Sequence, residues 1–219
     1  GLPIKRFPIA KARQDGLVVQ CRDQMDTQFR QAVLERTYPG SRELAILYSP
    51  LHGVGMSCVP QVLAADGFAD VEIFGPHEAA DGDFPNLPDH IANPENPVVF
   101  DALIERAEQR GADLILASDP DADRIGCAAR LSTDGSWRVL TGNQIAVLLA
   151  DYVLRRRAAA GSLSPEHYVA TTLVTTRMLR AVAEHHHVRP IADLFTGFKW
   201  IAGVIDELGP ERFVFAAEE

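Results

Sequence analysis

Cysteine is sparse in this chain, and long hydrophobic runs are missing. The 219 residues include three cysteines, Cys21, Cys58 and Cys127, which lie far apart without the paired spacing of a zinc site. So few, unpaired cysteines are typical of a reducing compartment, and we expect a cytoplasmic protein. No apolar run approaches the roughly 20 residues that cross a bilayer, so we expect no membrane partner.

Basic clusters are also rare. Lysine and arginine number 21 against 30 aspartates and glutamates, which leaves a formal net charge of −9. Without a basic stripe to follow a phosphate backbone, a nucleic-acid partner is not expected. The densest basic cluster, 155–157, comes near the end of a predicted helix, where positive charge favours the helix dipole. Hydrophobic residues make up 47% of the chain, which is enough to build folded cores.

Short apolar runs alternate with helical patterns from about residue 44 onward. This order predicts an α/β fold, in which helices cover both faces of a sheet, with two units in tandem. In the first unit we predict strands at 44–48, 71–74 and 114–117, helices at 56–65 and 98–110, and a hairpin formed by 125–131 and 137–140. A long polar loop from 75 to 97 separates the second strand from the second helix.

A second unit is predicted to begin at Thr141, whose hydroxyl suits the N-cap of a helix that reaches Gly161. We predict strands at 168–174 and 212–215 and helices at 175–186 and 198–208. The predicted domains are therefore 41–140 and 141–219. Residues 1–40 fit neither unit, and we expect a helix at 26–38 that connects to something beyond this chain.

The segment DPDADR leaves the end of the predicted strand 114–117. Asp119, Asp121 and Asp123 alternate there, and in an extended backbone alternate side chains point the same way, so they can converge on one cation. Carboxylate oxygens suit Mg²⁺ or Ca²⁺ rather than Zn²⁺. A calcium-binding EF-hand needs glycine at its sixth position and glutamate at its twelfth, but Arg124 and Arg130 stand there. An EF-hand is therefore excluded.

Arg124, which directly follows the three aspartates, indicates what kind of ligand the acidic segment binds. A guanidinium beside a metal can hold the same phosphate through two parallel hydrogen bonds, which indicates phosphoryl transfer. The alternative is a solvated acidic turn, since Asp and Pro are common turn formers. Repulsion among three close carboxylates counts against that alternative.

Taken with its neighbours, the acidic segment resembles the metal loop of the α-D-phosphohexomutase superfamily, the phosphoglucomutases and phosphomannomutases. Further segments match family motifs in order: SPLHGVG at 49–55, DGDFP at 81–85 with NPE at 93–95, TGFKWI at 196–201, and EE at 218–219. The resemblance covers about residues 40–219. It implies three-layer α/β/α domains with mixed sheets, corresponding to the second and most of the third domain of that family.

The resemblance also implies roles for individual residues. Asp119, Asp121 and Asp123 would bind Mg²⁺, and Arg124 would contact a phosphoserine or the phosphate in transfer. Three residues of the second unit would recognise the sugar, the loop residues Thr196 and Gly197 and the hydrogen-bonding Glu218. The family interconverts hexose 1-phosphates and hexose 6-phosphates, an isomerase reaction that passes through a bisphosphorylated intermediate.

Two family features have no counterpart in this sequence. Nothing matches the TASHNP-like loop that carries the phosphoserine, and the fourth domain that grips the second phosphate is absent. The third domain also stops before the serine of its EES loop. We therefore expect a fragment whose partners are a phosphosugar and the missing first and fourth domains, and which does not turn over substrate alone.

Two other functions stay open from the sequence. One is a phosphatase with an aspartate nucleophile, although Ala122-Asp123-Arg124 fits that loop poorly. The other is a non-catalytic metal-binding or ligand-binding module. For His52-Gly53-Val54-Gly55 we favour a tight turn over an anion site, and the sequence assigns no role to His52 or Lys199.

Overall fold

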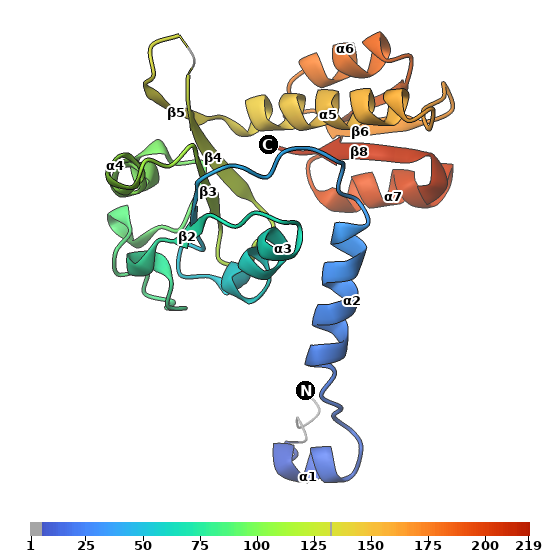
Figure 1. The fold of residues 1–219 in the computed structure, drawn as a ribbon. Coiled ribbons are helices and arrows are strands. Elements are labelled where there is room, and N and C mark those ends of the chain that lie inside the picture. Colours follow the sequence, from blue (N-terminus) through green and yellow to red (C-terminus); the bar gives the residue numbers. More distant parts are fainter. Residues whose placement is uncertain (1–5, 132) are drawn as a thin grey trace.

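Two β-sheets divide the chain into two tandem α/β units (Figure 1). The computed structural model describes residues 6–131 and 133–219. Both units have helices on the two faces of their sheet, so the predicted α/β class with two tandem units is confirmed.

The first unit contains a mixed five-stranded sheet in the order β2-β1-β3-β4-β5. Its first three strands run parallel, and β4 and β5 are antiparallel additions at one edge. The strands are β1 (Ile46–Ser49), β2 (Val71–Ile73), β3 (Leu114–Ser118), β4 (Ile125–Arg130) and β5 (Trp137–Leu140). All of these strands were predicted, β4 and β5 as a hairpin, with bounds that differ from the observed ones by at most two residues.

Helices α3 (Val59–Ala65) and α4 (Asp101–Arg110) cover opposite faces of this sheet (Figure 1). Both begin later than predicted, because a 3₁₀ turn precedes each of them, at Val54–Ser57 and Pro97–Phe100. Two further 3₁₀ turns, Gly75–His77 and Pro88–His90, shape the long polar loop. The core between sheet and α4 is built from Leu47, Phe100, Leu103 and Ile115, all fully buried.

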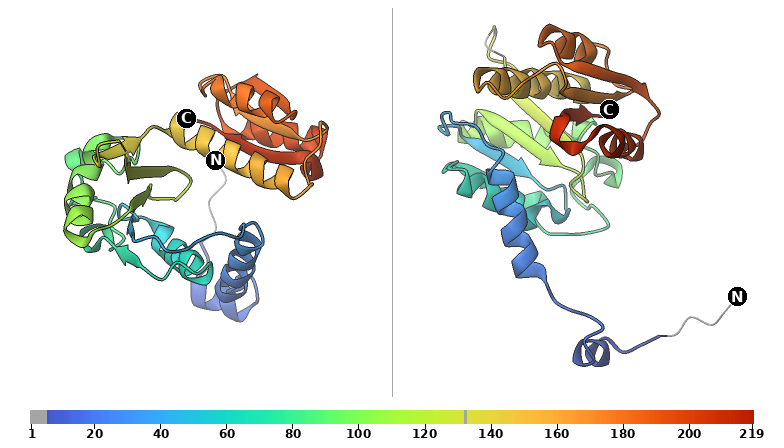
Figure 2. Two further views of the ribbon diagram at one scale, coloured as in Figure 1. Left: turned by 45° about the horizontal axis from the view of Figure 1, so that its top comes forward. Right: turned by 90° about the vertical axis from the view of Figure 1, so that its right-hand side faces the viewer.

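The second unit contains three parallel strands in the order β7-β6-β8. Helices α5 and α6 lie on one face of this sheet and α7 on the other (Figure 2). The elements are α5 (Gly142–Ala159), β6 (Tyr168–Thr172), α6 (Met178–His185), β7 (Arg189–Leu194), α7 (Phe198–Leu208) and β8 (Phe213–Ala217). Thr141 caps α5 as predicted: its hydroxyl accepts from Gln144 N at 3.2 Å, and the Gln144 side chain accepts from Thr141 N.

Strand β7 was not predicted. Its sequence contains Pro190 and Asp193, both of which are unfavourable in a central strand. The strand lies at the edge of the sheet and pairs with β6 alone, so a missing amide donor and an exposed acid are tolerated there. The sequence pattern of an edge strand is therefore weaker than that of the buried β6.

The N-terminal segment forms two helices, α1 (Ile9–Gln14) and α2 (Arg22–Leu34), which extend away from the sheets (Figure 2). The predicted helix 26–38 is thus displaced by four residues toward the N-terminus, and α1 was not predicted. Helix α2 contacts α3 but buries none of its own residues. Residues 1–5 of the predicted 1–40 segment lie outside the described residues.

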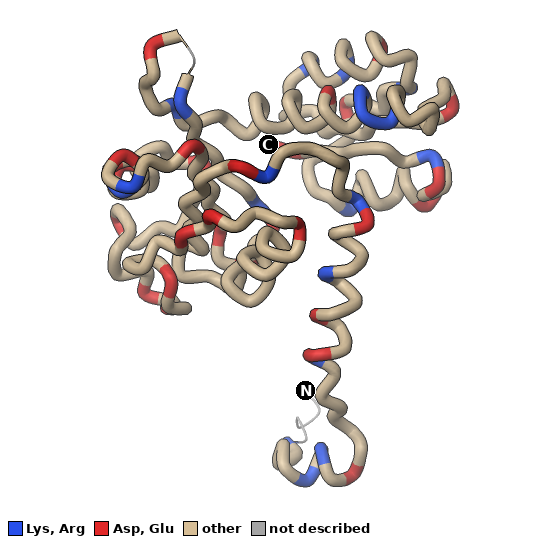
Figure 3. Tube along the Cα trace, viewed as in Figure 1, with Lys and Arg blue, Asp and Glu red and all other residues tan. Residues whose placement is uncertain are grey.

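Charged residues of both signs are spread over the two units (Figure 3). In the part of the chain that the structure describes, no helix is both long and apolar enough to cross a membrane.

The stretch that joins α2 to β1 is tied to the second unit by aromatic and cationic contacts. The Arg156 guanidinium of α5 lies 5.4 Å from the ring centre of Tyr38 and 5.7 Å from that of Tyr152, and it donates a hydrogen bond to the carbonyl of Pro39. The two tyrosine rings meet edge to face at 5.8 Å. These contacts connect segments far apart in sequence, so they help to set how the units are arranged.

We predict that Arg156→Ala lowers the free energy of unfolding by about 1 kcal/mol, because it removes two cation–π contacts and a charged hydrogen bond. The matched control is Arg155→Ala. Among the residues that the structure describes, Arg155 pairs only with Asp151, one turn away on the same helix at 2.8 Å. That control should cost at most about half as much. Urea unfolding of both variants measures the difference. Equal losses of unfolding free energy would show that the contacts of Arg156 with Tyr38, Tyr152 and Pro39 do not stabilise the chain.

Candidate metal and phosphate site

The acidic loop is the turn of the β3–β4 hairpin. Ser118 pairs with Ile125 across the two strands, and the six residues between them form the loop. The backbone turns tightly: Ala122 N donates to Asp119 O at 3.0 Å, and Ala122 has a left-handed φ of 61°. The expectation of an extended backbone is therefore wrong. The carboxylates converge because the loop folds back, not because alternate residues share a face.

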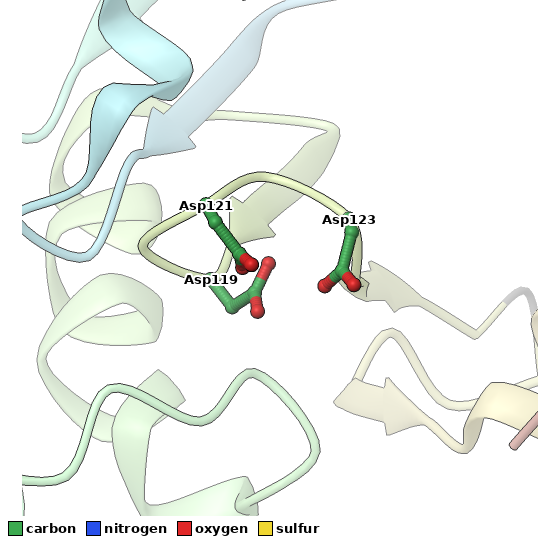
Figure 4. A group of neighbouring side chains, drawn as sticks. All are labelled: Asp119, Asp121 and Asp123. Carbon is green, nitrogen blue, oxygen red and sulfur yellow. The ribbon is translucent and has the colours of Figure 1, made fainter. Parts of the chain in front are cut away.

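Asp119, Asp121 and Asp123 point toward one another across this turn (Figure 4). Each offers a carboxylate oxygen, and the three oxygens lie within 4.8 Å of one another. Asp119 is only 2% exposed, whereas the other two face solvent. A set of hard oxygen donors open to solvent on one side fits a magnesium ion, which keeps several ligand positions for water or phosphate.

Both oxygens of the Asp119 carboxylate are held by Arg124. The Arg124 backbone N–H donates to Oδ1 at 2.9 Å, and its guanidinium Nε donates to Oδ2 at 3.1 Å. Burial acts to raise the pKa of Asp119, but these hydrogen bonds and the positive charge of Arg124 bring that pKa below its usual value. The buried carboxylate therefore stays ionised and is aimed into the turn.

Asp123 has the opposite shift. Burial and the negative charges of Asp119 and Asp121 raise the pKa of the Asp123 carboxyl above its usual value. The loop thus concentrates negative charge that destabilises its own ionised form. A divalent cation would relieve that repulsion, which agrees with a metal site.

The glycine-containing loop 51–55 supports the acidic loop from behind. Gly53 N donates to Pro50 O at 2.8 Å, so the predicted tight turn is confirmed. Val54 N donates to Pro120 O at 2.8 Å, which means that this amide contacts the acidic loop rather than an anion. A Cβ on Gly53 would lie 2.3 Å from Pro120 Cα, and one on Gly55 would lie 2.1 Å from the Tyr48 hydroxyl. Close approach of two loops, which the sequence did not reveal, is a second reason for these glycines.

The two histidines near this loop hold backbone in place. His52 Nδ1 donates to Ala79 O at 2.8 Å, and His77 Nε2 donates to Asn86 O at 3.3 Å. The Ser49 hydroxyl donates to His77 Nδ1 at 2.9 Å. Burial lowers the pKa of His77 to about 4, so its ring is neutral at physiological pH. His52, whose role the sequence left open, joins the loop 51–55 to the segment after β2.

The amino-acid residues that were predicted to bind the sugar lie at the end of β8 and just before α7. Gly197 N donates to Glu218 Oε2 at 2.7 Å, and Gly197 has a φ of 114°, which favours glycine. Thr196 is exposed. Lys199 extends its ammonium group over the Trp200 ring, 5.3 Å from its centre.

A cleft of about 340 Å³ lies between the two units. Asp123 and Arg124 line it from the first unit, and Glu218 lines it from the second. The structure thus brings these three predicted residues together, whereas Thr196 and Gly197 are not among the lining residues. Glu95 and Phe198 also line the cleft, and sequence reasoning assigned neither a role. Their presence in the NPE and TGFKWI segments was the available signal.

A two-unit α/β/α chain with an acidic turn at the cleft has relatives of known class. The protein-family model for phosphoglucomutase/phosphomannomutase, alpha/beta/alpha domain II, matches residues 27–132. The family model for domain III matches residues 141–219. The chain therefore belongs to the phosphoglucomutase/phosphomannomutase family.

Individual relatives agree with this assignment. The chain is 29% identical to a phosphomannomutase of Mycoplasmoides pirum over 95% of its length, and 34% identical to a phosphoglucomutase of Staphylococcus epidermidis over 84%. It spans 38% and 32% of those proteins, about a third of each. A crystal structure of a family protein from Burkholderia thailandensis has the same fold, with a TM-score of 0.62 at 22% identity over 86% of this chain and 37% of that one.

Gly53→Ala should distort the acidic loop, because the new methyl group meets the Pro120 backbone, which cannot move as a flexible side chain would. We expect a loss of roughly 1–3 kcal/mol in the free energy of unfolding and weaker binding of Mg²⁺. Gly82→Ala is the matched control, since nothing lies within 4 Å of its Cβ. Chemical denaturation and calorimetric metal titration of both variants measure these effects. Unchanged metal binding in Gly53→Ala would show that the contact with loop 51–55 does not determine the geometry of the acidic loop.

His77 predicts a pH dependence of stability. Its pKa is about 4 in the folded chain against 6.5 for the ordinary residue, so only the unfolded chain takes up the proton between these values. The free energy of unfolding should fall by up to about 3 kcal/mol as the pH drops from 6.5 to 4. His77→Gln should flatten this part of the profile, whereas exposed His185→Gln should not. Urea midpoints measured across that pH range decide the outcome.

Proposed function

We propose that this chain supplies the magnesium-binding and sugar-recognition parts of a phosphohexomutase that interconverts hexose 1-phosphates and hexose 6-phosphates. The observation that carries the proposal is the convergence of three carboxylates beside Arg124, with Asp123 and Arg124 lining a cleft that Glu218 lines from the other unit. The proposed domains are residues 41–140 and 141–219, preceded by the connecting segment 1–40.

Asp119, Asp121 and Asp123 would hold Mg²⁺ in this proposal. A related structure with the same fold, N-acetylphosphoglucosamine mutase of Aspergillus fumigatus, was determined in complex with GlcNAc-6P and magnesium. Bound at this turn, the ion would offset negative charge on a phosphoryl group. The residues of the chain would position that group: the hairpin turn sets the direction of the carboxylates, and loop 51–55 holds the turn in place.

Arg124 would contact the phosphate. Its Nε and Nη1 groups are engaged by Asp119 and Asn93, at 3.1 and 3.2 Å, and its side chain is 45% exposed on the cleft. Within the described part of the chain, no acceptor bonds to Nη2, which leaves this donor for a phosphate oxygen. A guanidinium held by two protein acceptors loses little freedom when it binds, so it suits this role.

Thr196, Gly197 and Glu218 would recognise the sugar. Glu218 already accepts a hydrogen bond from Gly197 N through Oε2, which orients its carboxylate toward the loop that precedes α7. Its remaining acceptor capacity would receive sugar hydroxyls. The apolar faces of Ile125 and Phe198 in the same cleft would exclude water around the bound phosphosugar.

The complete reaction would need groups from outside this chain. We propose that the phosphoserine and the second phosphate-binding site lie in the first and fourth domains of a longer enzyme, and that this chain alone does not turn over substrate. The chain spans about a third of its relatives, which supports this division of the enzyme.

A phosphatase with an aspartate nucleophile is less well supported. Ala122-Asp123-Arg124 fits the loop of such an enzyme poorly, and the family models that match this chain are those of phosphoglucomutases and phosphomannomutases. No observation favours a non-catalytic module over an enzyme fragment.

Calorimetric titration with Mg²⁺ tests the site. Asp121→Asn removes one exposed ligand without disturbing the core and should weaken the binding of Mg²⁺ about tenfold or more. Asp206→Asn removes the same charge from the exposed face of α7 and should leave the affinity unchanged. Equal effects of the two substitutions would reduce the acidic turn to a general electrostatic attraction and would remove the basis of the proposed function.

A further inference from the structure

The Asn93-Pro94-Glu95 turn lies against the acidic hairpin. Asn93 Oδ1 accepts a hydrogen bond from Arg124 Nη1 at 3.2 Å, although the two residues are 31 positions apart in the chain. The same oxygen accepts from Glu95 N at 3.0 Å. Both partners are donors, so the amide oxygen, not the amide nitrogen, faces them. One atom therefore closes a local turn and holds the guanidinium.

The position of Asn93 is set by the structure around it. Its N–H donates to Ile91 O at 3.1 Å, and its carbonyl accepts from Asn96 N at 3.1 Å. On either side, Ala92 packs in the core of the first unit and Pro94 is buried. A Cβ on Gly126 would lie 2.6 Å from Pro94 O, so β4 and this turn are in direct contact just after Arg124. The surrounding structure therefore holds the side-chain oxygen of Asn93 in place beside the partly exposed Arg124.

Arg124 is held from two sides by acceptors of different kinds. Asp119 accepts from Nε with an oxygen of a charged carboxylate that is also proposed to bind the metal, whereas Asn93 accepts from Nη1 with a neutral amide oxygen. A neutral acceptor fixes the plane of the guanidinium without cancelling its charge, so the charge stays available to a phosphate. An aspartate at the same place would bind the guanidinium more strongly and would compete with that phosphate.

From these contacts we propose that Asn93 is a positioning residue, which orients the Arg124 guanidinium so that Nη2 faces the cleft. This inference rests on the proposed role of Arg124 as the phosphate contact. If Asn93 only stabilised its own turn, the hydrogen bond from Glu95 N would be sufficient. The second hydrogen bond, from Arg124, is the one that the positioning role requires.

The test uses substitutions that divide these roles. Asn93→Ala removes both hydrogen bonds, while Asn93→Ser keeps an acceptor for the turn but is too short to reach Arg124. Asn96→Ala is the matched control: Asn96 is the same residue type in the same segment, and its side chain accepts from Val98 N at 3.2 Å rather than from Arg124. Asn93→Asp keeps both acceptors.

The first readout is rotation of the Arg124 guanidinium about its Nε–Cζ bond, measured by ¹⁵N NMR of the ligand-free chain and assigned with Arg124→Ala. Rotation should be slow in the unsubstituted chain and in Asn96→Ala and Asn93→Asp. It should become several-fold faster in Asn93→Ala and Asn93→Ser. Unchanged rotation in both of these variants, or faster rotation in Asn93→Ala alone, would overturn the proposal and leave Asn93 as a turn former.

The second readout is the affinity for glucose 1,6-bisphosphate at saturating Mg²⁺. Asn93→Ala and Asn93→Ser should weaken it roughly tenfold, with Mg²⁺ affinity unchanged, because the released guanidinium would then have to be ordered when the phosphate binds. An Arg124→Ala variant that binds as well as the unsubstituted chain would refute the proposed function. An Arg124→Ala variant that binds weakly beside an unaffected Asn93→Ala would refute only the positioning role.

Discussion

The buried carboxylate of Asp119 is the constraint on which the site depends. A charge that is 2% exposed must be compensated, and Arg124 compensates it with a backbone and a side-chain hydrogen bond from the far side of the same hairpin. This pairing closes the loop on itself and brings Asp121 and Asp123 to the same point. The guanidinium that results is already oriented, which reduces the freedom it would lose on meeting a phosphate.

Support for this hairpin comes from segments that are distant in sequence. Loop 51–55 contacts it through Val54 N and Pro120 O, and the turn at Asn93 contacts it through Arg124. The side chains of Tyr48 and Ser118 join the neighbouring strands β1 and β3 with a buried hydrogen bond of 2.7 Å. These contacts involve backbone atoms and buried side chains, so they fix the position of the acidic turn relative to the sheet. A site of defined geometry requires such support.

Most of the buried elements followed from the sequence, and the exposed ones did not. Strands β1, β3 and β6 are rich in apolar and β-branched residues, and the cap at Thr141 is a local signal. Both kinds of feature could therefore be recognised from neighbouring residues alone. Strand β7 escaped because Pro190 and Asp193 are tolerated only at an edge, and the edge is a property of the assembled sheet. Helix α2 was displaced because it buries no residue that would give it a period.

For the site, the sequence alone determined which residues carry the chemistry: three closely spaced aspartates, an arginine beside them and a glycine loop that matches a known family. Only the tertiary structure decided how they meet. It replaced the expected extended segment with a left-handed turn at Ala122, and showed that Gly53 is needed for contact with Pro120 as well as for its own turn. The physical reason is that residue type sets the available charge and donors, whereas the shape of the turn depends on the pairing of β3 with β4 and on contacts with loops 30 or more positions away.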